Sequence, residues 1–399
     1  MFRCLPLAVA ATLAAGSILS SSDRSATASR VAGGAGLRAR RPPTLTPQQS
    51  GTVNRLQAVS PVNSRVVWAS GLNGTYVLTT DGGMTWRARV VPGAEALQFR
   101  DVEGVSEKVA YLLSAGSGAD SRIYKTEDGG ESWSLQFQNQ DPDAFYDCFA
   151  FWAPRRGVTM SDAVNGRFPV IRTSDGETWE DIGDSLPPAQ AGEAAFAASG
   201  TCVVTQGGRR AWIGTGGAAR ARILATTDRG RTWTAHGTPI VQGTGTSGVI
   251  TVDFRDPFHG ILGGGEILAP TVFADTVARS RDGGKTWRLA SRTPFPGAVY
   301  GLGYARGRGG ADDQDDGDDD ENDDAEDEGD RDGDGDGDGD GDEGRIVVVT
   351  GPSGAAWSSD EGDTWSSLSG VANYWAVAFA SPRAGWLVGT QGRILKISF

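Results

Sequence analysis

Carboxylate side chains are the residues of this 399-residue sequence that could most directly do chemistry. Asp147, Asp162 and Glu193 could supply the paired carboxyl groups that cleave a glycosidic bond, although nothing in their spacing requires it. Only two histidines, His236 and His259, are present, and no phosphate-binding loop, dinucleotide fingerprint or nucleophile elbow occurs. The sequence therefore offers little material for His-based catalysis or for a nucleotide site.

An acidic tract over residues 311–344 is the one segment that could hold a metal ion. Its Asp332, Asp334, Asp336 and Glu343 match the spacing of an EF-hand calcium loop. However, repeated Gly-Asp matches many registers by composition alone, and Gly339 stands where such loops carry an apolar anchor. We expect a disordered, solvated polyanion, with weak calcium binding as the alternative and no other cofactor.

A short motif that occurs six times marks the elements that must position these side chains. The first copy is "TTDGGMTW" (79–86), and we call each copy a box. Asp followed by Gly between two apolar runs is typical of a tight hairpin turn, in which the Asp carboxylate accepts backbone hydrogen bonds. The third copy, "TSDGETW" (173–179), is one residue short, so we expect its turn to differ. The aspartates of the six boxes are Asp81, Asp128, Asp175, Asp228, Asp282 and Asp360.

The spacing of the boxes is typical of a β-propeller. The Trp residues that close the boxes are 47, 46, 54, 54 and 78 residues apart. The last gap contains the 34-residue acidic tract, and its removal leaves 44 residues, so we interpret the tract as an insertion within the sixth blade. Each unit reads as four strands. The C-terminal segment 374–399 resembles the start of the first unit but stops before a box, and residues before Leu56, such as "QQSGTVN" (48–54), could supply its missing strand.

We therefore predict an all-β, seven-bladed propeller over residues 51–399 whose ring is closed by an N-terminal strand; six or eight blades are alternatives. In four-stranded blades, the loops on the face opposite the boxes surround the mouth of the propeller and form a candidate recognition surface, unless they only face solvent. Aligned inner strands place there Arg55, Gln98, Asp147, Glu193, Ile250, Tyr300 and Trp375. Neighbouring loops add Asp162, Arg167, Arg220, Arg222 and Glu266.

The N-terminus predicts export. Residues 1–28 combine an Arg, a short apolar run and small residues, which is typical of a secretory signal peptide, and residues 29–50 read as a flexible leader. No other segment is predicted to span a bilayer. We expect a periplasmic or extracellular monomer. There Cys148 and Cys202 are expected to be two buried small residues, with a disulfide as the alternative.

The charge distribution gives no indication of nucleic-acid binding. The formal net charge is −13, but the acidic tract holds 21 Asp and Glu against one Arg, which leaves the rest of the chain at about +7. Since six of the 41 N-terminal residues are arginines and only one is acidic, the propeller body is nearly neutral. A binding partner is therefore expected to be a protein or a glycan rather than a nucleic acid.

The boxes resemble the bacterial neuraminidase repeats, or Asp-boxes, of known propellers. Together with "FYDCFAFW", "GEAAFAASGTC" and the terminal "GRILKISF", they make residues 52–399, without the acidic tract, similar to the family of the photosystem II stability and assembly factor. This resemblance implies a scaffold that binds a membrane-protein assembly intermediate, partly through an arginine patch. Arg209, Arg210, Arg220 and Arg222 cluster in sequence and could form that patch.

We accordingly expect an exported, non-catalytic propeller that binds another protein. The alternative is an Asp-box glycoside hydrolase or a carbohydrate-binding propeller. A sialidase would require an Arg triad and an Arg-Ile-Pro-like motif near the start, whereas the nearest match, "RFP" (167–169), lies in the third unit. Fold alone does not decide between these functions.

Overall fold

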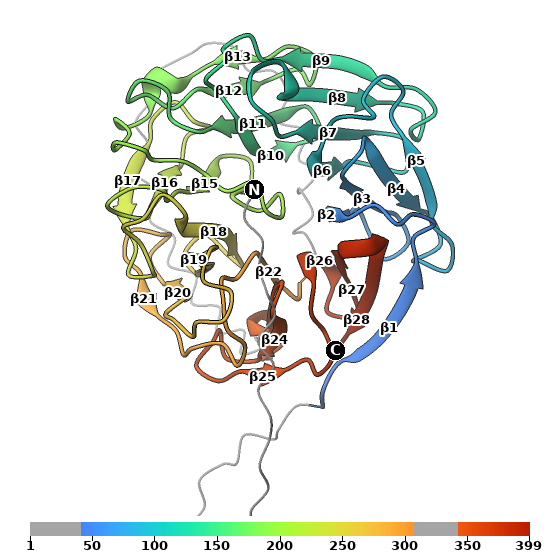
Figure 1. Ribbon diagram of the computed structural model, residues 1–399, viewed down its shortest axis with the longest axis vertical. Coiled ribbons are helices and arrows are strands. Elements are labelled where there is room, and N and C mark those ends of the chain that lie inside the picture. The colour runs from blue at the N-terminus through green and yellow to red at the C-terminus, as the bar shows by residue number, and fades with distance from the viewer. Residues whose placement is uncertain (1–40, 307–341) are drawn as a thin grey trace, which may run out of the picture. The chain divides into compact units, whose positions relative to one another are not determined.

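Seven four-stranded antiparallel sheets form the fold in the computed structural model, which describes residues 41–306 and 342–399 (Figure 1). The first three blades, from inner to outer strand, are β2 (Leu56–Pro61), β3 (Val67–Gly71), β4 (Thr75–Thr79), β5 (Arg87–Val90); β6 (Phe99–Gly104), β7 (Ala110–Ser114), β8 (Arg122–Thr126), β9 (Ser134–Gln138); and β10 (Tyr146–Ala153), β11 (Arg156–Ser161), β12 (Val170–Thr173), β13 (Glu180–Asp181). The next three are β14 (Val203–Gln206), β15 (Arg210–Gly214), β16 (Arg222–Thr226), β17 (Thr234–Gly237); β18 (Ser247–Phe254), β19 (Gly260–Glu266), β20 (Val277–Ser280), β21 (Arg288–Leu289); and β22 (Gly301–Tyr304), β23 (Val347–Gly351), β24 (Gly354–Ser358), β25 (Ser366–Ser367). Blade seven contains β26 (Tyr374–Ser381), β27 (Ala384–Gly389), β28 (Arg393–Ser398) and β1 (Thr44–Gln49).

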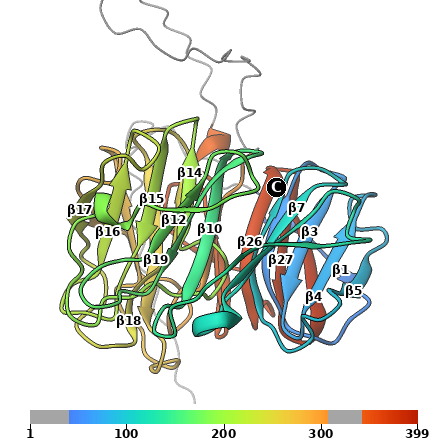
Figure 2. The same cartoon turned by 90° about the horizontal axis from the view of Figure 1, so that it is seen from above.

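The blades follow one another around a common axis, and their inner strands are neighbours in the order β2, β6, β10, β14, β18, β22, β26 and back to β2. Figure 2 shows the same blades from the side. The described residues contain seven hydrophobic clusters, and each lies between two adjacent blades. This confirms the seven-bladed, all-β prediction. Because each sheet buries both faces against its neighbours, the core is a ring of inter-blade contacts.

Ring closure uses an earlier segment than the sequence indicated. β1 pairs with β28 in the antiparallel register Thr44↔Ser398 to Gln49↔Arg393. The closing strand thus lies within the predicted leader (29–50). It shares only residues 48 and 49 with the predicted strand segment (48–54). The reason is distance, because the chain needs residues 50–55 to pass from the outer edge of blade seven to the inner strand of blade one.

Each box forms the turn between the third and fourth strands of its blade. In the first, the hydroxyl of Thr79 donates to Asp81 Oδ1 at 2.8 Å and accepts from the N–H of Gly83 at 2.9 Å. The other end is held by Thr85, whose N–H and hydroxyl donate to Asp81 at 2.9 and 2.6 Å. In the shorter third box, Asp175 accepts N–H bonds from residues two and three positions ahead, so this turn does differ, as expected.

A disulfide joins Cys148 of β10 to Cys202, which directly precedes β14. Their Cα atoms are 5.9 Å apart and both residues are fully buried. The expectation of two unlinked cysteines is therefore wrong. The sequence could not decide this point because the distance between the inner strands of adjacent blades is not visible in the residue spacing. The bond links blades three and four across 54 residues.

Two other predicted segments lie outside the described residues, namely the signal peptide (1–28) and nearly all of the acidic tract. Residues 305–346 connect β22 to β23 within one sheet, which places the tract in blade six. The described part of this connection includes the short 3₁₀ turn η3 (Asp342–Arg345). The connection leaves β22 and enters β23 on the box face, because the first-to-second and third-to-fourth connections of a blade lie on the same face.

The box carboxylates should make stability depend on acid. Hydrogen bonds from the hydroxyl and N–H of Ser132 hold the pKa of Asp128 at about 2, below its usual 3.8. A carboxyl whose folded-state pKa is depressed stabilises the fold above the unfolded-state value and loses that contribution as pH falls toward 2. Asp128→Ala should therefore lower the melting temperature at pH 7, and this deficit should shrink between pH 4 and 2. Asp120→Ala, which removes an exposed carboxyl outside any box, is the control. A deficit for Asp128→Ala that does not change with pH would contradict this account.

Candidate binding face at the mouth of the propeller

The candidate site lies on the face opposite the boxes, which we call the mouth face. It carries the connections between the second and third strands and those that lead into each inner strand. These connections are long in blades three to six, where residues 162–169, 182–202, 267–276 and 290–300 lie outside the main strands. Long connections on a rigid sheet scaffold are the usual place for binding residues.

The inner strands of blades one, two, three, five and seven share a β-bulge near the mouth face. At each, the pairing register shifts by one residue, so that one extra residue turns away from the regular alternation. The extra residues are Gln57, Arg100, Asp147, Ile250 and Trp375. The sequence alignment identified the last three but placed Arg55 and Gln98 in the first two blades, two residues early, and it missed Arg100.

Residues 193–201 lie across the propeller axis instead of extending the inner strand of blade four. The carbonyl of Ala197 accepts a 3.4 Å hydrogen bond from Arg100 Nη1 of blade two. The hydroxyl of Ser199 donates to the carbonyl of Tyr300, at the start of blade six, at 2.6 Å. These contacts to two distant blades explain why β14 begins only at residue 203.

Gly200 is required at the crossing. It adopts a left-handed backbone conformation with φ +75°, and a Cβ atom at this position would lie 2.3 Å from Asp101 Oδ1. Any larger residue would displace a carboxylate that accepts the N–H of Phe149 in the next blade at 2.8 Å. The glycine thus lets the crossing segment approach blades one and two closely.

Five residues around this crossing form what we call the mouth cluster: Arg55, Gln98, Arg100, Tyr300 and Trp375. The Arg55 guanidinium lies 4.5 Å from the centre of the Trp375 ring, and the rings of Tyr300 and Trp375 meet edge to face at 4.9 Å. Arg100 donates through Nε and Nη2 to the amide oxygen of Gln98 at 3.2 and 2.7 Å. All five side chains are partly exposed. Ile250 and Asp147, which were also predicted at the mouth, are buried.

Asp147 and Asp162 form a buried carboxyl pair beside the cluster. Burial raises the pKa of Asp147 well above its usual value, and the neighbouring Asp162 adds to the effect. Burial likewise raises the pKa of Asp162 to about 6, although its Oδ1 accepts the N–H of Ala195 at 3.0 Å. Two adjacent carboxyls share a proton rather than both ionising. The prediction that Asp147 faces the mouth as a recognition group is wrong, because only 2% of it is exposed.

Glu193 and Arg222 form a buried ion pair, so neither projects from the mouth face as predicted. The Glu193 side chain is fully buried, and its Oε2 lies 2.5 Å from Arg222 Nη2. Its Oε1 accepts from Arg222 Nε at 2.8 Å and from the Thr215 hydroxyl at 2.6 Å. The carboxylate is therefore saturated with donors. The pair holds the crossing segment against blade four and has no capacity left for a ligand.

The predicted arginine patch is not a single surface. Arg209 and Arg210 lie at the turn that begins β15, on the box face, whereas Arg220 and Arg222 lie on the mouth face. One five-residue strand separates the two pairs. Arg167 does lie on the mouth face, but Asp181 and Asp184 pair with it at 2.7 and 2.6 Å. Of the predicted arginines on the mouth face, Arg220 alone has an exposed side chain with no carboxylate partner among the described residues.

The alternative of glycoside cleavage finds no suitable carboxyl pair among Asp147, Asp162 and Glu193. Asp147 is buried against Asp162, and Glu193 is engaged by Arg222. Glu266 is nearer to solvent, but Thr244 and the N–H of Leu268 occupy its oxygens. An acid–base pair must reach the substrate from both sides of the bond. None of these predicted carboxyls has that arrangement.

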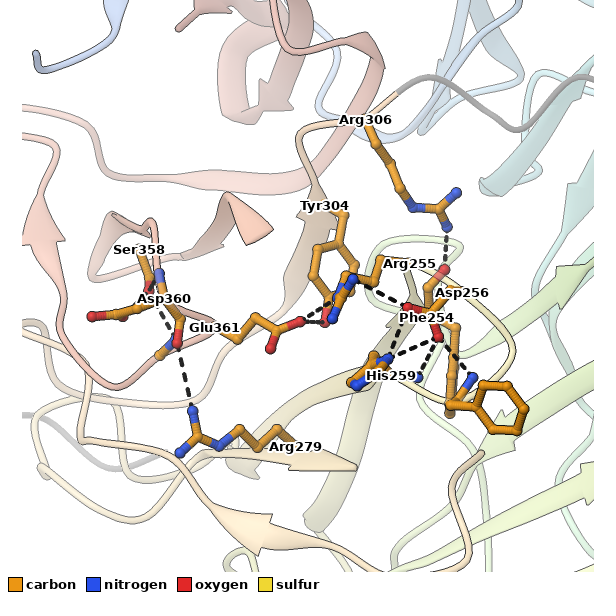
Figure 3. Close-up of polar contacts among 12 residues, drawn as sticks. Phe254, Arg255, Asp256, His259, Arg279, Tyr304, Arg306, Ser358, Asp360 and Glu361 are labelled. Carbon is orange, nitrogen blue, oxygen red and sulfur yellow. Dashed lines mark hydrogen bonds and ion pairs between the residues drawn. The ribbon is translucent and has the colours of Figure 1, made fainter. Parts of the chain in front are cut away.

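A second charged cluster on the box face was not visible in the sequence analysis (Figure 3). Glu361, in the sixth box, accepts from Arg255 Nε at 2.6 Å and from the Tyr304 hydroxyl at 3.1 Å. Asp256, next to Arg255, also contacts His259 Nδ1 at 2.8 Å. The one available signal was a Glu where most boxes have Gly. Because these groups satisfy one another between blades five and six, the cluster is a joint between blades.

The described residues contain no group of three or more His, Cys, Asp or Glu side chains placed to hold a metal ion. The predicted calcium residues Asp332, Asp334 and Asp336 lie outside that part of the chain, as does the side chain of Glu343. Within the same described ranges, no helix has the length and apolar character needed to cross a membrane.

Neutralising the carboxyl pair should change how stability depends on pH. Since the folded-state pKa of Asp162 is raised, the pair favours folding below about pH 4 and loses that advantage as pH rises through 6. Asp147→Asn should raise the stability at pH 7.5 by roughly 1–3 kcal/mol and have little effect at pH 4. Thermal melts at the two pH values test this, with the exposed Asp143→Asn as control. An equal loss of stability at both pH values would contradict this account, because it would show that the fold requires the carboxyl group of Asp147 whatever its charge.

Removing one member of the buried ion pair should destabilise the fold. Arg222→Gln leaves the Glu193 carboxylate buried without its partner, and we expect a loss of about 3–5 kcal/mol in denaturant unfolding. Arg220→Gln, two residues earlier, removes an exposed side chain and should change stability by less than about 0.5 kcal/mol. If the two variants unfold alike, the ion pair does not have the structural role assigned to it.

Comparison with known proteins supports the fold. No protein-family model and no curated protein sequence matches the chain. Among solved structures, YCF48 from Cyanidioschyzon merolae is similar with a TM-score of 0.57 and 14% identity, over 89% of this chain and 98% of that one. The GH74 xyloglucanase from Xanthomonas campestris is similar with a TM-score of 0.53 and 12% identity, over 88% of this chain and 53% of that one. The chain thus shares the propeller fold of YCF48 over nearly the whole length of YCF48, and it spans about half the length of the xyloglucanase.

Proposed function

We propose that the chain is an exported scaffold that binds another protein on its mouth face. The fold shared with YCF48 and the predicted resemblance to photosystem II assembly factors both support a membrane-protein intermediate as the partner. The predicted signal peptide supports export to the periplasm or beyond, and the Cys148–Cys202 disulfide suits an oxidising compartment.

The observation that carries this proposal is an exposed apolar loop on blade five. Leu268, Val272 and Phe273 are 75%, 53% and 54% exposed. The loop is nevertheless held in place, because the N–H of Gly297 donates to the carbonyl of Val272 at 2.9 Å. The Ser353 hydroxyl donates to the carbonyl of Pro270, also at 2.9 Å. Apolar side chains held rigidly in water are typical of surfaces that dock a protein.

Capture of a partner by the full-length, tagged protein from an extract of its native host tests the proposal. The informative variant is Phe273→Ser, and the matched control is Phe258→Ser, which removes a similarly exposed phenylalanine (60%) on the box face. We expect mass spectrometry to find one membrane-protein complex enriched with the natural protein and with Phe258→Ser, and at least tenfold less of it with Phe273→Ser. Equal capture by both variants would place the partner elsewhere.

Carbohydrate binding is the second candidate, and the edge-to-face pair of Tyr300 and Trp375 favours it. Aromatic rings at a propeller mouth could stack on a sugar, and a xyloglucanase shares the fold. Failure to enrich any protein, together with binding to a glycan array that is lost in Trp375→Ala, would favour this function over the scaffold.

A further inference from the structure

The mouth cluster holds two arginines whose charges are not matched by a carboxylate. Burial is the main cause that lowers the pKa of Arg100. Repulsion by the nearby charge of Arg55 lowers that pKa further. Neither forms an ion pair among the described residues, although Arg167, Arg222 and Arg255 all do. The charge of Asp147 acts on Arg100 and raises its pKa, but the two form no ion pair, and Asp147 shares its proton with Asp162. A partly buried pair of like charges is costly unless an anion neutralises it.

The hydrogen-bond donors of the cluster are also incompletely used. Among the described residues, the Arg55 guanidinium makes one hydrogen bond, a 3.4 Å contact from Nη2 to the amide oxygen of Gln57. Its Nε is buried without an acceptor, and so is Nε1 of the adjacent Trp375. Arg100 is bonded only to neutral acceptors, the Gln98 amide and the Ala197 carbonyl. Buried donors without acceptors are uncommon in folded proteins. Here two of them lie next to unpaired positive charge, and this combination suits an acceptor from outside the chain.

The aromatic residues give the site its shape. With one face of the Arg55 guanidinium over the Trp375 ring, the donors that remain lie in the guanidinium plane, which is the geometry that a carboxylate meets with two parallel hydrogen bonds. The Ser199 hydroxyl fixes the main chain of Tyr300 through its carbonyl, and the Tyr300 ring packs edge to face against Trp375. The two rings offer an apolar surface to whatever group carries the carboxylate.

We propose that the mouth cluster is a carboxylate-binding site. Arg55 binds the carboxylate with two hydrogen bonds, Arg100 contributes the second positive charge, and Trp375 and Tyr300 contact the apolar group attached to it. This inference rests on the proposed function only for the source of the carboxylate, which is an acidic residue of the protein partner or a free small carboxylate. The apolar loop on blade five is a separate contact on the same face.

Benzoate is a suitable probe because it joins a carboxylate to a flat ring, and benzamide is its uncharged control. We expect titration calorimetry of the full-length protein to detect benzoate binding that is absent for benzamide and much weaker for inorganic phosphate. Arg55→Gln should weaken benzoate binding about tenfold to a hundredfold, as expected for lost charge-assisted hydrogen bonds. Arg55→Lys, which keeps the charge but not the paired geometry, should lie in between. Arg209→Gln, exposed on the box face, is the matched control, and thermal melts check that each variant is folded.

The outcomes separate the site from the scaffold function. Capture of the partner that benzoate inhibits and benzamide does not would assign the carboxylate to the partner. Benzoate binding that depends on Arg55 but leaves capture unchanged, or occurs with no partner at all, would assign the site to a free small carboxylate. Equal binding of benzoate and benzamide, phosphate binding as tight as that of benzoate, or unchanged binding by a folded Arg55→Gln would overturn the proposal.

Discussion

Closure of the ring is the constraint on which the rest of the structure depends. A propeller blade buries both faces of its sheet, so no blade is stable without two neighbours. The first and last blades must therefore pack against each other. The pairing of β1 with β28 meets this requirement by giving blade seven its outer strand from the opposite end of the chain. In the described chain the blades are separate sheets, and the links between neighbouring blades come from both main chain and side chains. The N–H of Val252 in blade five donates to the carbonyl of Thr201, next to the inner strand of blade four, at 3.0 Å. Asp101 accepts the N–H of Phe149, and Asp253 accepts that of Tyr304 at 2.9 Å.

The boxes show where the chain departs from the simplest turn in order to join blades. The residue after the box aspartate has a left-handed backbone in every box, and in the first it is Gly82 with φ 75°. Arg229 and Glu361 occupy this position in the fourth and sixth boxes with φ 62° and 56°, a conformation that costs a residue with a side chain about 1 kcal/mol or more. The contacts of Glu361 with Arg255 and Tyr304 offset that cost and fix the joint between blades five and six (Figure 3).

The sequence predicts the repeat architecture well because a repeated turn is a local signal. Its hydrogen bonds join residues no more than four apart, so six copies with regular spacing reveal six repeat units, and the acidic tract is recognisable as an excess of length. The seventh blade follows from the C-terminal segment without a box, and six or eight blades stay open as alternatives. The candidate site is less predictable because it depends on relations between units. Arg210 and Arg220 are close in sequence, yet β15 carries the chain from one face to the other between them. Glu193 looked like a surface carboxylate, and only the crossing of residues 193–201 shows why it is buried.

The bulges connect the architecture to the site. A regular inner strand would alternate its side chains between the two neighbouring blades, whereas one extra residue turns Arg100 and Trp375 toward the axis at the same level. The crossing segment then contacts both sides of the site. The carbonyl of Ala197 accepts a hydrogen bond from Arg100, and Ser199 donates to the carbonyl of Tyr300, whose ring packs against Trp375. A cluster held in this way from several blades loses little conformational freedom when it binds, so more of its interaction energy appears as affinity. Elsewhere in the described chain, carboxylates match the charges of Arg255 and Arg279 between blades five and six, and that of Arg222 within blade four. The charges of Arg55 and Arg100 have no carboxylate partner among the described residues, and their rigid position on the mouth face suits them to a ligand from outside the chain.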